Sequence, residues 1–73
     1  MDEKELKELL IKENPEFRRA HNDHQDCERA LEAIRGKTHL SAAEADEERE
    51  LKKKKLALKD RMYRLMSDYL RSR

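Results

Sequence analysis

The chain has 73 residues, of which 48% are charged and only 4% aromatic, yet its formal net charge is +1. With a single cysteine it cannot form an internal disulfide, so the sequence does not have the pattern of a secreted disulfide scaffold. Disordered chains combine low hydrophobicity with high net charge. Because the charges here balance and the apolar residues recur at regular spacing, we expect a small folded helical domain.

The first expected helix covers residues 2–13 and ends where Asn14 precedes Pro15. Proline disfavours helix continuation through its own position, and the residue before it is biased away from helical geometry. Asparagine is also a favoured N-cap and proline fits the first helical turn, so a second helix is expected to start here. We therefore expect a first arm that is kinked at Asn14.

The second expected helix covers residues 15–35 and ends at Gly36, the only glycine. A loop over residues 36–41 follows. Ser41 and Glu44 then have the spacing of a capping box, which predicts a third helix over residues 42–72. Because short loops join antiparallel helices, the sequence predicts a single all-α domain over residues 1–73, folded as an antiparallel helical hairpin.

Apolar residues in both arms recur at alternating spacings of three and four, which is the pattern of a helix–helix seam. Folding the chain about its loop brings Leu58 near Ala20, Met62 near Phe17 and Tyr69 near Leu10. The expected hairpin core is Leu10, Phe17, Ala20, Cys27, Leu31 and Ile34 from the first arm and Leu51, Leu58, Met62, Leu65 and Tyr69 from the second.

The third helix carries more apolar surface than one neighbouring helix needs. Leu56, Tyr63, Met66 and Leu70 form a second stripe beside the seam. We expect this stripe to be a dimer face, so that two hairpins form a four-helix bundle as a homodimer. The alternative is that residues 2–13 fold back over the stripe within one chain.

His24 and Lys55 fall at seam positions. In the folded register His24 faces Lys54 or Lys55, and Asp23, Asp26 and Glu28 are close by. A polar layer in an apolar seam can fix register and oligomeric state at a cost in stability, and we assign that role to this pair. His21, His24 and Cys27 also have spacings that place zinc-ligand side chains on one helix face. Known helical metal sites draw their ligands from several elements. The favoured interpretation is therefore that Cys27 packs in the core and that His24 is partly buried. We expect no metal or other cofactor.

Four consecutive lysines, at positions 52–55, lie inside the third helix. They could neutralise phosphates, which would make the chain a small nucleic-acid-associated protein. Acidic residues precede the run, no aromatic residue interrupts it for base stacking, and no known nucleic-acid-binding motif is present. A solvated charged face is the favoured interpretation.

Three segments are similar to the small bacterial YdcH-like family, a coiled-coil-forming domain of unknown function. They are residues 12–17 (KENPEF), His24 followed by Cys27, Glu28 and Leu31, and residues 51–60 (LKKKKLALKD). The resemblance extends over about residues 10–66, and its last segment is the most specific. The family has Leu-Asp at positions 27–28 and an apolar residue at position 21, which weakens the metal hypothesis. The resemblance implies a helical hairpin and supplies no catalytic residues.

The sequence therefore predicts a non-enzymatic structural or protein–protein interaction module without a small-molecule substrate. Its expected partner is a second copy of the chain, in a homodimer, or another protein. Nucleic-acid association through residues 52–55 is the alternative. Nothing in the chain has the pattern of a glycine-rich phosphate loop or a catalytic triad. The acidic start is unlike a secretion signal, and no apolar run approaches the ~18 residues of a membrane span, so we expect a cytoplasmic protein.

Overall fold

The computed structural model describes residues 1–72, which form three α-helices and no β-strand. Helix α1 spans Glu3–Glu13, α2 spans Pro15–Arg35 and α3 spans Ala42–Arg71. Each helix begins and ends within one residue of the range expected from the sequence. The fold is therefore all-α, and its elements are the ones that the capping signals predict.

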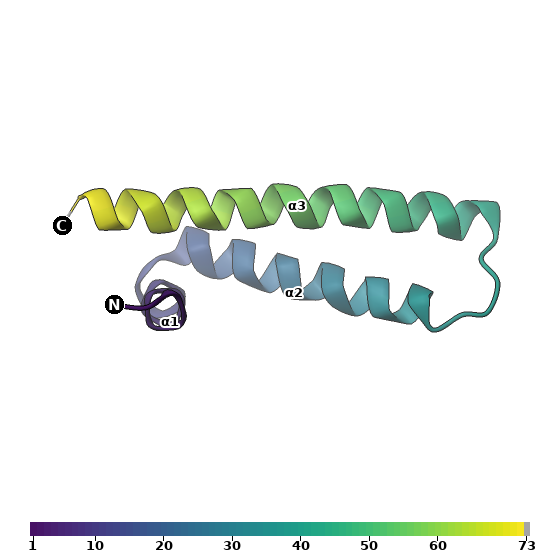
Figure 1. The fold of residues 1–73 in the computed structure, drawn as a ribbon, viewed down its shortest axis with the longest axis horizontal. Helices are drawn as coiled ribbons and strands as arrows, with labels where there is room; N and C mark the ends of the chain where they lie inside the picture. The colour runs from purple at the N-terminus through teal and green to yellow at the C-terminus, as the bar shows by residue number, and fades with distance from the viewer. Residues whose placement is uncertain (73) are drawn as a thin grey trace.

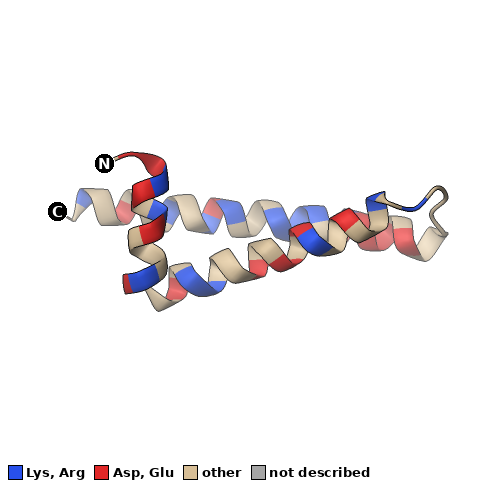
Figure 2. Cartoon of the chain, turned by 90° about the horizontal axis from the view of Figure 1, so that it is seen from below, with Lys and Arg blue, Asp and Glu red and all other residues tan. Residues whose placement is uncertain are grey.

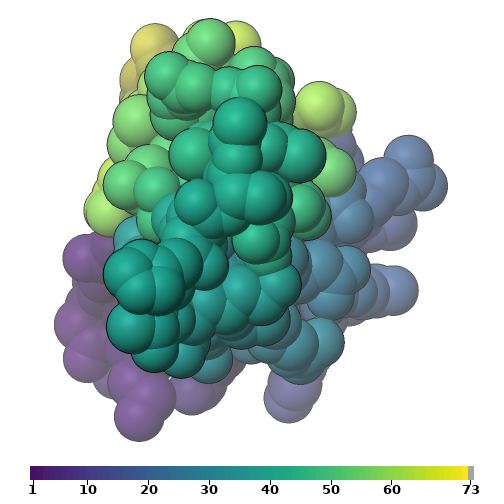
Figure 3. Space-filling view, turned by 90° about the vertical axis from the view of Figure 1, so that its right-hand side faces the viewer, coloured from purple at the N-terminus to yellow at the C-terminus, as the bar shows by residue number. Residues whose placement is uncertain are grey.

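Helices α2 and α3 lie side by side and run in opposite directions, joined by the loop that follows α2 (Figure 1). Helix α1 does not continue the line of α2 but crosses the pair near the C-terminal end of α3 (Figures 1 and 2). Seen from the loop end, α1 protrudes on one side of the pair (Figure 3). The molecule is consequently elongated, with extents of 49 × 19 × 16 Å.

Asn14 ends α1 and begins α2. Its backbone N–H donates to the carbonyl of Leu10 at 2.8 Å, and its side-chain oxygen accepts from the backbone N–H groups of Glu16 at 3.0 Å and Phe17 at 3.1 Å. One residue thus satisfies groups that both helix ends would otherwise leave unpaired. Its extended backbone, with φ −118° and ψ 106°, makes the turn.

Arg18, in the first turn of α2, links back to α1. Its Nε donates to the carbonyl of Ile11 at 2.8 Å and its Nη2 to the carbonyl of Lys12 at 3.0 Å. These carbonyls belong to the last turn of α1 and have no partner within their own helix. Because one guanidinium reaches two of them, it holds α1 at a defined angle to α2.

The loop is closed by backbone and side-chain caps. The N–H of Gly36 donates to the carbonyl of Glu32 at 3.1 Å, and the φ of Gly36 is −72°, so the helix ends without the left-handed conformation that usually favours glycine there. The Ser41 hydroxyl accepts from the N–H of Glu44, whose carboxylate accepts from the N–H of Ser41, as the capping box predicts. Lys37 also pairs with Glu44, and this hydrogen bond, followed by those from Ser41, lowers the pKa of Glu44 to about 2.

The core is concentrated where α1 crosses the other two helices. Leu6 and Leu10 from α1 pack there with residues of α2 and α3. Farther along α2, towards the loop, Cys27, Leu31 and Ile34 are also buried. The full set of buried apolar residues is Leu6, Leu10, Phe17, Ala20, Cys27, Leu31, Ile34, Met62 and Met66.

Four residues of α3 that the sequence assigns to the hairpin core are only partly buried: Leu51, Leu58, Leu65 and Tyr69. The seam pattern places them towards α2, and Leu58, Leu65 and Tyr69 do pack against the core cluster. Two adjacent helices cannot enclose a seam from every side, however, so its edges keep contact with water.

Candidate interaction surface

Three large apolar side chains on α3 are exposed to solvent. Leu56 is 63% exposed, Tyr63 45% and Leu70 50%. They are spaced seven residues apart, and seven residues of an α-helix turn through almost two full revolutions. The three therefore form a stripe along one side of α3, which we call the α3 stripe.

Met66, which the sequence places on the same face, lies instead in the core of the monomer. It is only 6% exposed and packs in the cluster that contains Leu6 and Leu10. The reason is that α1 crosses α3 at this level. Part of the second apolar surface is thus covered within the chain, as the alternative interpretation of the sequence requires, and Leu56, Tyr63 and Leu70 stay open.

The N-terminus of the chain lies beside the C-terminal part of the α3 stripe. Met1, Asp2 and Glu3 line a groove together with Tyr63 and Leu70. Met1 is itself 63% exposed. This groove therefore combines apolar side chains with charged residues of both signs, Asp2, Glu3 and Arg71.

The predicted polar layer lies at the edge of the helix pair rather than inside it, because among residues 1–72 no polar or charged residue is buried. The His24 and Lys55 side chains retain 18% and 31% of their exposure, and both approach one carboxylate oxygen of Glu28, at 3.7 Å and 3.5 Å. The sequence places Glu28 close to this layer, and in the structure its carboxylate lies between the two side chains. Partial burial lowers the pKa of His24; Glu28 opposes this, while Lys55 adds to it.

The lysine run is largely matched by carboxylates. Lys52 lies 3.8 Å from Glu48, Lys53 lies 3.8 Å from Glu50, and Lys55 reaches Glu28 on α2. Among residues 1–72, only Lys54 of the four is without an ion pair. Figure 2 shows these basic residues in the middle of α3 and acidic ones towards the loop.

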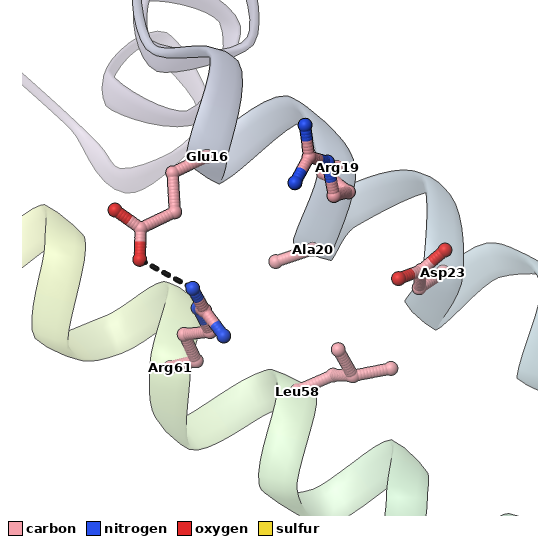
Figure 4. A pocket seen from close by; sticks show the side chains of 6 residues that line it. All are labelled: Glu16, Arg19, Ala20, Asp23, Leu58 and Arg61. Carbon is pink, nitrogen blue, oxygen red and sulfur yellow. Dashed lines mark hydrogen bonds and ion pairs between the residues drawn. The ribbon is translucent and has the colours of Figure 1, made fainter.

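A shallow pocket of about 110 Å³ lies between α2 and α3 (Figure 4). Arg61 on α3 pairs with Glu16 on α2 at 2.5 Å, and Arg19 and Asp23 lie farther along the same rim. Ligand sites for small molecules usually occupy about 300–1,000 Å³. Because the Arg61–Glu16 ion pair crosses from α3 to α2 here, this pocket is better described as a polar link between the helices.

The residues considered for a metal site do not assemble into one. Among residues 1–72, no three histidine, cysteine or acidic side chains are placed to hold an ion together. Cys27 is 3% exposed and packs as a core residue. In the same part of the chain, no helix is long and apolar enough to cross a membrane.

The chain was compared with known protein families, curated proteins and solved structures. A family model described as a protein of unknown function, DUF465, matches residues 17–66. This segment contains most of α2 and α3 but not α1. Neither the curated proteins nor the solved structures include a match to the chain.

Proposed function

The chain belongs to the DUF465 family, which is the YdcH-like family it resembles in sequence, and we propose that it is a non-enzymatic helical module that associates with a second copy of itself. The observation that carries this proposal is the α3 stripe. Scattered apolar residues on a surface need no explanation, but three at heptad spacing on one helix are the pattern of a helix–helix interface.

A second copy is the occupant that best suits the stripe. Small domains bury a limited fraction of their surface, and a symmetric dimer extends the core without any additional partner. Two stripes packed together would cover six large side chains, each already about half-buried. Burial of this apolar surface favours association, and the loss of translational and rotational freedom opposes it. Because the interface is small, we expect a weak dimer in the micromolar range rather than a nanomolar one.

The ion pairs of the lysine run weigh against a nucleic-acid role. Lys52, Lys53 and Lys55 each have a carboxylate within 3.8 Å, so a phosphate would have to compete with an existing partner. Binding to nucleic acid would also weaken steeply between low and moderate salt, whereas an apolar helix interface would persist. The salt dependence of any association therefore separates the two functions.

The test compares two charge insertions at neighbouring exposed positions of α3. Leu56→Glu places a carboxylate in the stripe, whereas Ala57→Glu places the same group one residue away, outside it. Analytical ultracentrifugation should show the dissociation constant of the dimer raised at least tenfold by Leu56→Glu and changed less than threefold by Ala57→Glu. Circular dichroism checks that both variants keep their helices. A wild-type chain that stays monomeric at hundreds of micromolar, or two variants that behave alike, would contradict the proposal.

A further inference from the structure

One carboxylate oxygen links α2 to α3 in the half of the pair nearest the loop. Glu28 Oε1 lies 3.5 Å from Nζ of Lys55 on α3 and 3.7 Å from Nδ1 of His24, one turn earlier on α2. The contact with Lys55 crosses between the helices, whereas the contact with His24 stays within α2. Both partners therefore reach the same oxygen, but only one of the two contacts holds the helices together.

The protonation state of His24 decides how that oxygen is shared. A neutral imidazole leaves the charge of Glu28 to Lys55. A protonated imidazole is itself a cation and forms an i,i+4 ion pair with Glu28 within α2. Because His24 and Lys55 are both partly buried, solvent screens this competition only in part. Protonation of His24 is therefore expected to weaken the link between the helices.

The other charged groups around His24 act in the same direction. Burial lowers the pKa of His24 most, and Glu28 opposes this. Lys55 and Lys59 on α3 and His21 on α2 lower the pKa further by their positive charge. A proton on His24 thus adds a positive charge where two lysines already lie, and separation of the helices relieves the repulsion.

The separation should remain local. Helix α1 crosses the pair at the end away from the loop, where Leu6 and Leu10 join the apolar cluster (Figure 1). Opening one part of a fold requires less free energy than unfolding all of it. The part of the α2–α3 pair nearest the loop can therefore open while the part that α1 crosses stays closed.

We propose that Glu28, His24 and Lys55 form a proton-sensitive latch: when His24 takes up a proton, Glu28 exchanges its partner on α3 for its partner on α2, and the pair opens near the loop. The latch belongs to the single chain and does not depend on self-association. Acid opens it and neutral pH closes it. It differs from a general loss of stability in acid because one contact between the helices is lost and one part of the fold opens.

A double-mutant cycle at two pH values tests the exchange of partners. Glu28→Gln, Lys55→Met and the double variant are compared with the wild type at about pH 7.5 and pH 5.5, at a concentration where sedimentation shows a monomer. Hydrogen exchange of amides on both sides of the loop, corrected for the intrinsic rate at each pH, measures the opening equilibrium. The coupling between Glu28 and Lys55 should change this equilibrium about two- to fivefold at the higher pH and less than about 1.5-fold at the lower pH.

Two histidine variants serve as controls. His24→Gln keeps a polar side chain that does not titrate, so the coupling in this background should be the same at both pH values. His39→Gln removes an exposed histidine of the loop and should leave the behaviour of the wild type unchanged. Circular dichroism checks that all variants keep their helices.

The outcomes separate a latch from a histidine without this role. A coupling that is equal at both pH values in the wild type, or that still falls in acid in the His24→Gln chain, would overturn the exchange of partners. A loss of protection in α1 as large as that near the loop would overturn the local opening. A coupling that falls in acid only while His24 is present, with α1 still protected, supports the latch.

Discussion

The two ends of the α2–α3 pair are stabilised in different ways. At one end α1 crosses the pair, and all three helices contribute to one apolar cluster: Leu6, Leu10, Phe17, Ala20, Met62 and Met66. At the loop end α2 supplies three buried apolar residues, while the half-buried positions of α3 include Glu48 and Lys55 as well as Leu51. We call these the crossing end and the loop end.

The difference shows how a charge-rich chain of this size can form a core. Two helices alone leave the edges of their seam in water, and at the crossing end α1 adds Leu6 and Leu10 to the buried cluster that contains Met66. At the loop end no third helix lies across the pair, and the capping box and the Glu28–Lys55 ion pair contribute instead. We therefore expect the crossing end to provide most of the stability and the loop end to be the more easily opened.

The largest expected effect comes from truncating one fully buried residue at each end. Phe17→Ala should cost about 4 kcal/mol of unfolding free energy, because its side chain is enclosed by three helices and leaves a cavity. Leu31→Ala should cost about 2–3 kcal/mol, because water and neighbouring side chains can enter the space at the two-helix end. Urea unfolding followed by circular dichroism measures both.

This pair of variants could overturn the comparison directly. If Leu31→Ala destabilises the chain as much as Phe17→Ala does, the crossing end and the loop end contribute equally to the stability of the fold. Phe17→Leu keeps the measurement possible if Phe17→Ala is too unstable to fold, and it should still cost more than the conservative Leu31→Met.

The next effect concerns how α1 is attached. Arg18→Ala removes two hydrogen bonds to carbonyls at the end of α1 and should cost about 1–2 kcal/mol. Hydrogen exchange should show the amides of α1 becoming less protected, with little change near the loop. Arg19→Ala is the matched control, because Arg19 lines the pocket between α2 and α3 and makes no hydrogen bond to α1. Equal effects of the two variants would refute the role given to Arg18.

At the loop end, Ser41→Ala removes the side-chain cap of α3 and should cost about 1 kcal/mol. Faster hydrogen exchange should be confined to the first turns of α3. Ala43→Ser, which changes a neighbouring exposed residue outside the cap, is the control. A loss of protection that reaches α1 would show that the two ends are not separate units.

The smallest effect is a pH dependence from His24, midway between the ends. Burial holds the pKa of His24 below its ordinary value of 6.5, so the unfolded chain binds a proton more readily than the folded one. Its contribution to stability is therefore present above pH 6.5 and is lost as the pH falls through 6.5 towards the lower folded pKa.

Thermal melts between about pH 7.5 and pH 5.5 measure this contribution. His24→Gln should reduce the loss of stability on acidification. Glu28→Gln should increase it, because Glu28 is the group that raises the pKa of His24. If the melting temperatures of the wild type and His24→Gln change in parallel, the histidine makes no such contribution.

The helices could be predicted from the sequence because their ends are set by local chemistry. The Asn14–Pro15 pair and the spacing of Ser41 and Glu44 act within one helical turn, and the structure has the helix ends within one residue of the expected positions. The DUF465 family membership was likewise carried by short motifs, and the family model confirms it.

The direction of α1 could not be predicted in the same way. Proline shows that a helix cannot continue, but the angle of the next segment depends on contacts such as that of Arg18 with Ile11. For this reason the periodicity of the sequence groups Met66 with Leu56, Tyr63 and Leu70, although α1 covers it in the structure. Seam periodicity also places His24 and Lys55 towards the neighbouring helix without showing that this edge remains open to water.

The most direct test of the central claim, that two copies associate through α3, is the mass of the wild-type chain in solution. Sedimentation equilibrium over a concentration series from about 1 μM to several hundred micromolar covers the affinity expected for such a small interface. The account predicts a reversible shift from the 8.8 kDa monomer to twice that mass within this range. A mass that stays at 8.8 kDa throughout would contradict it.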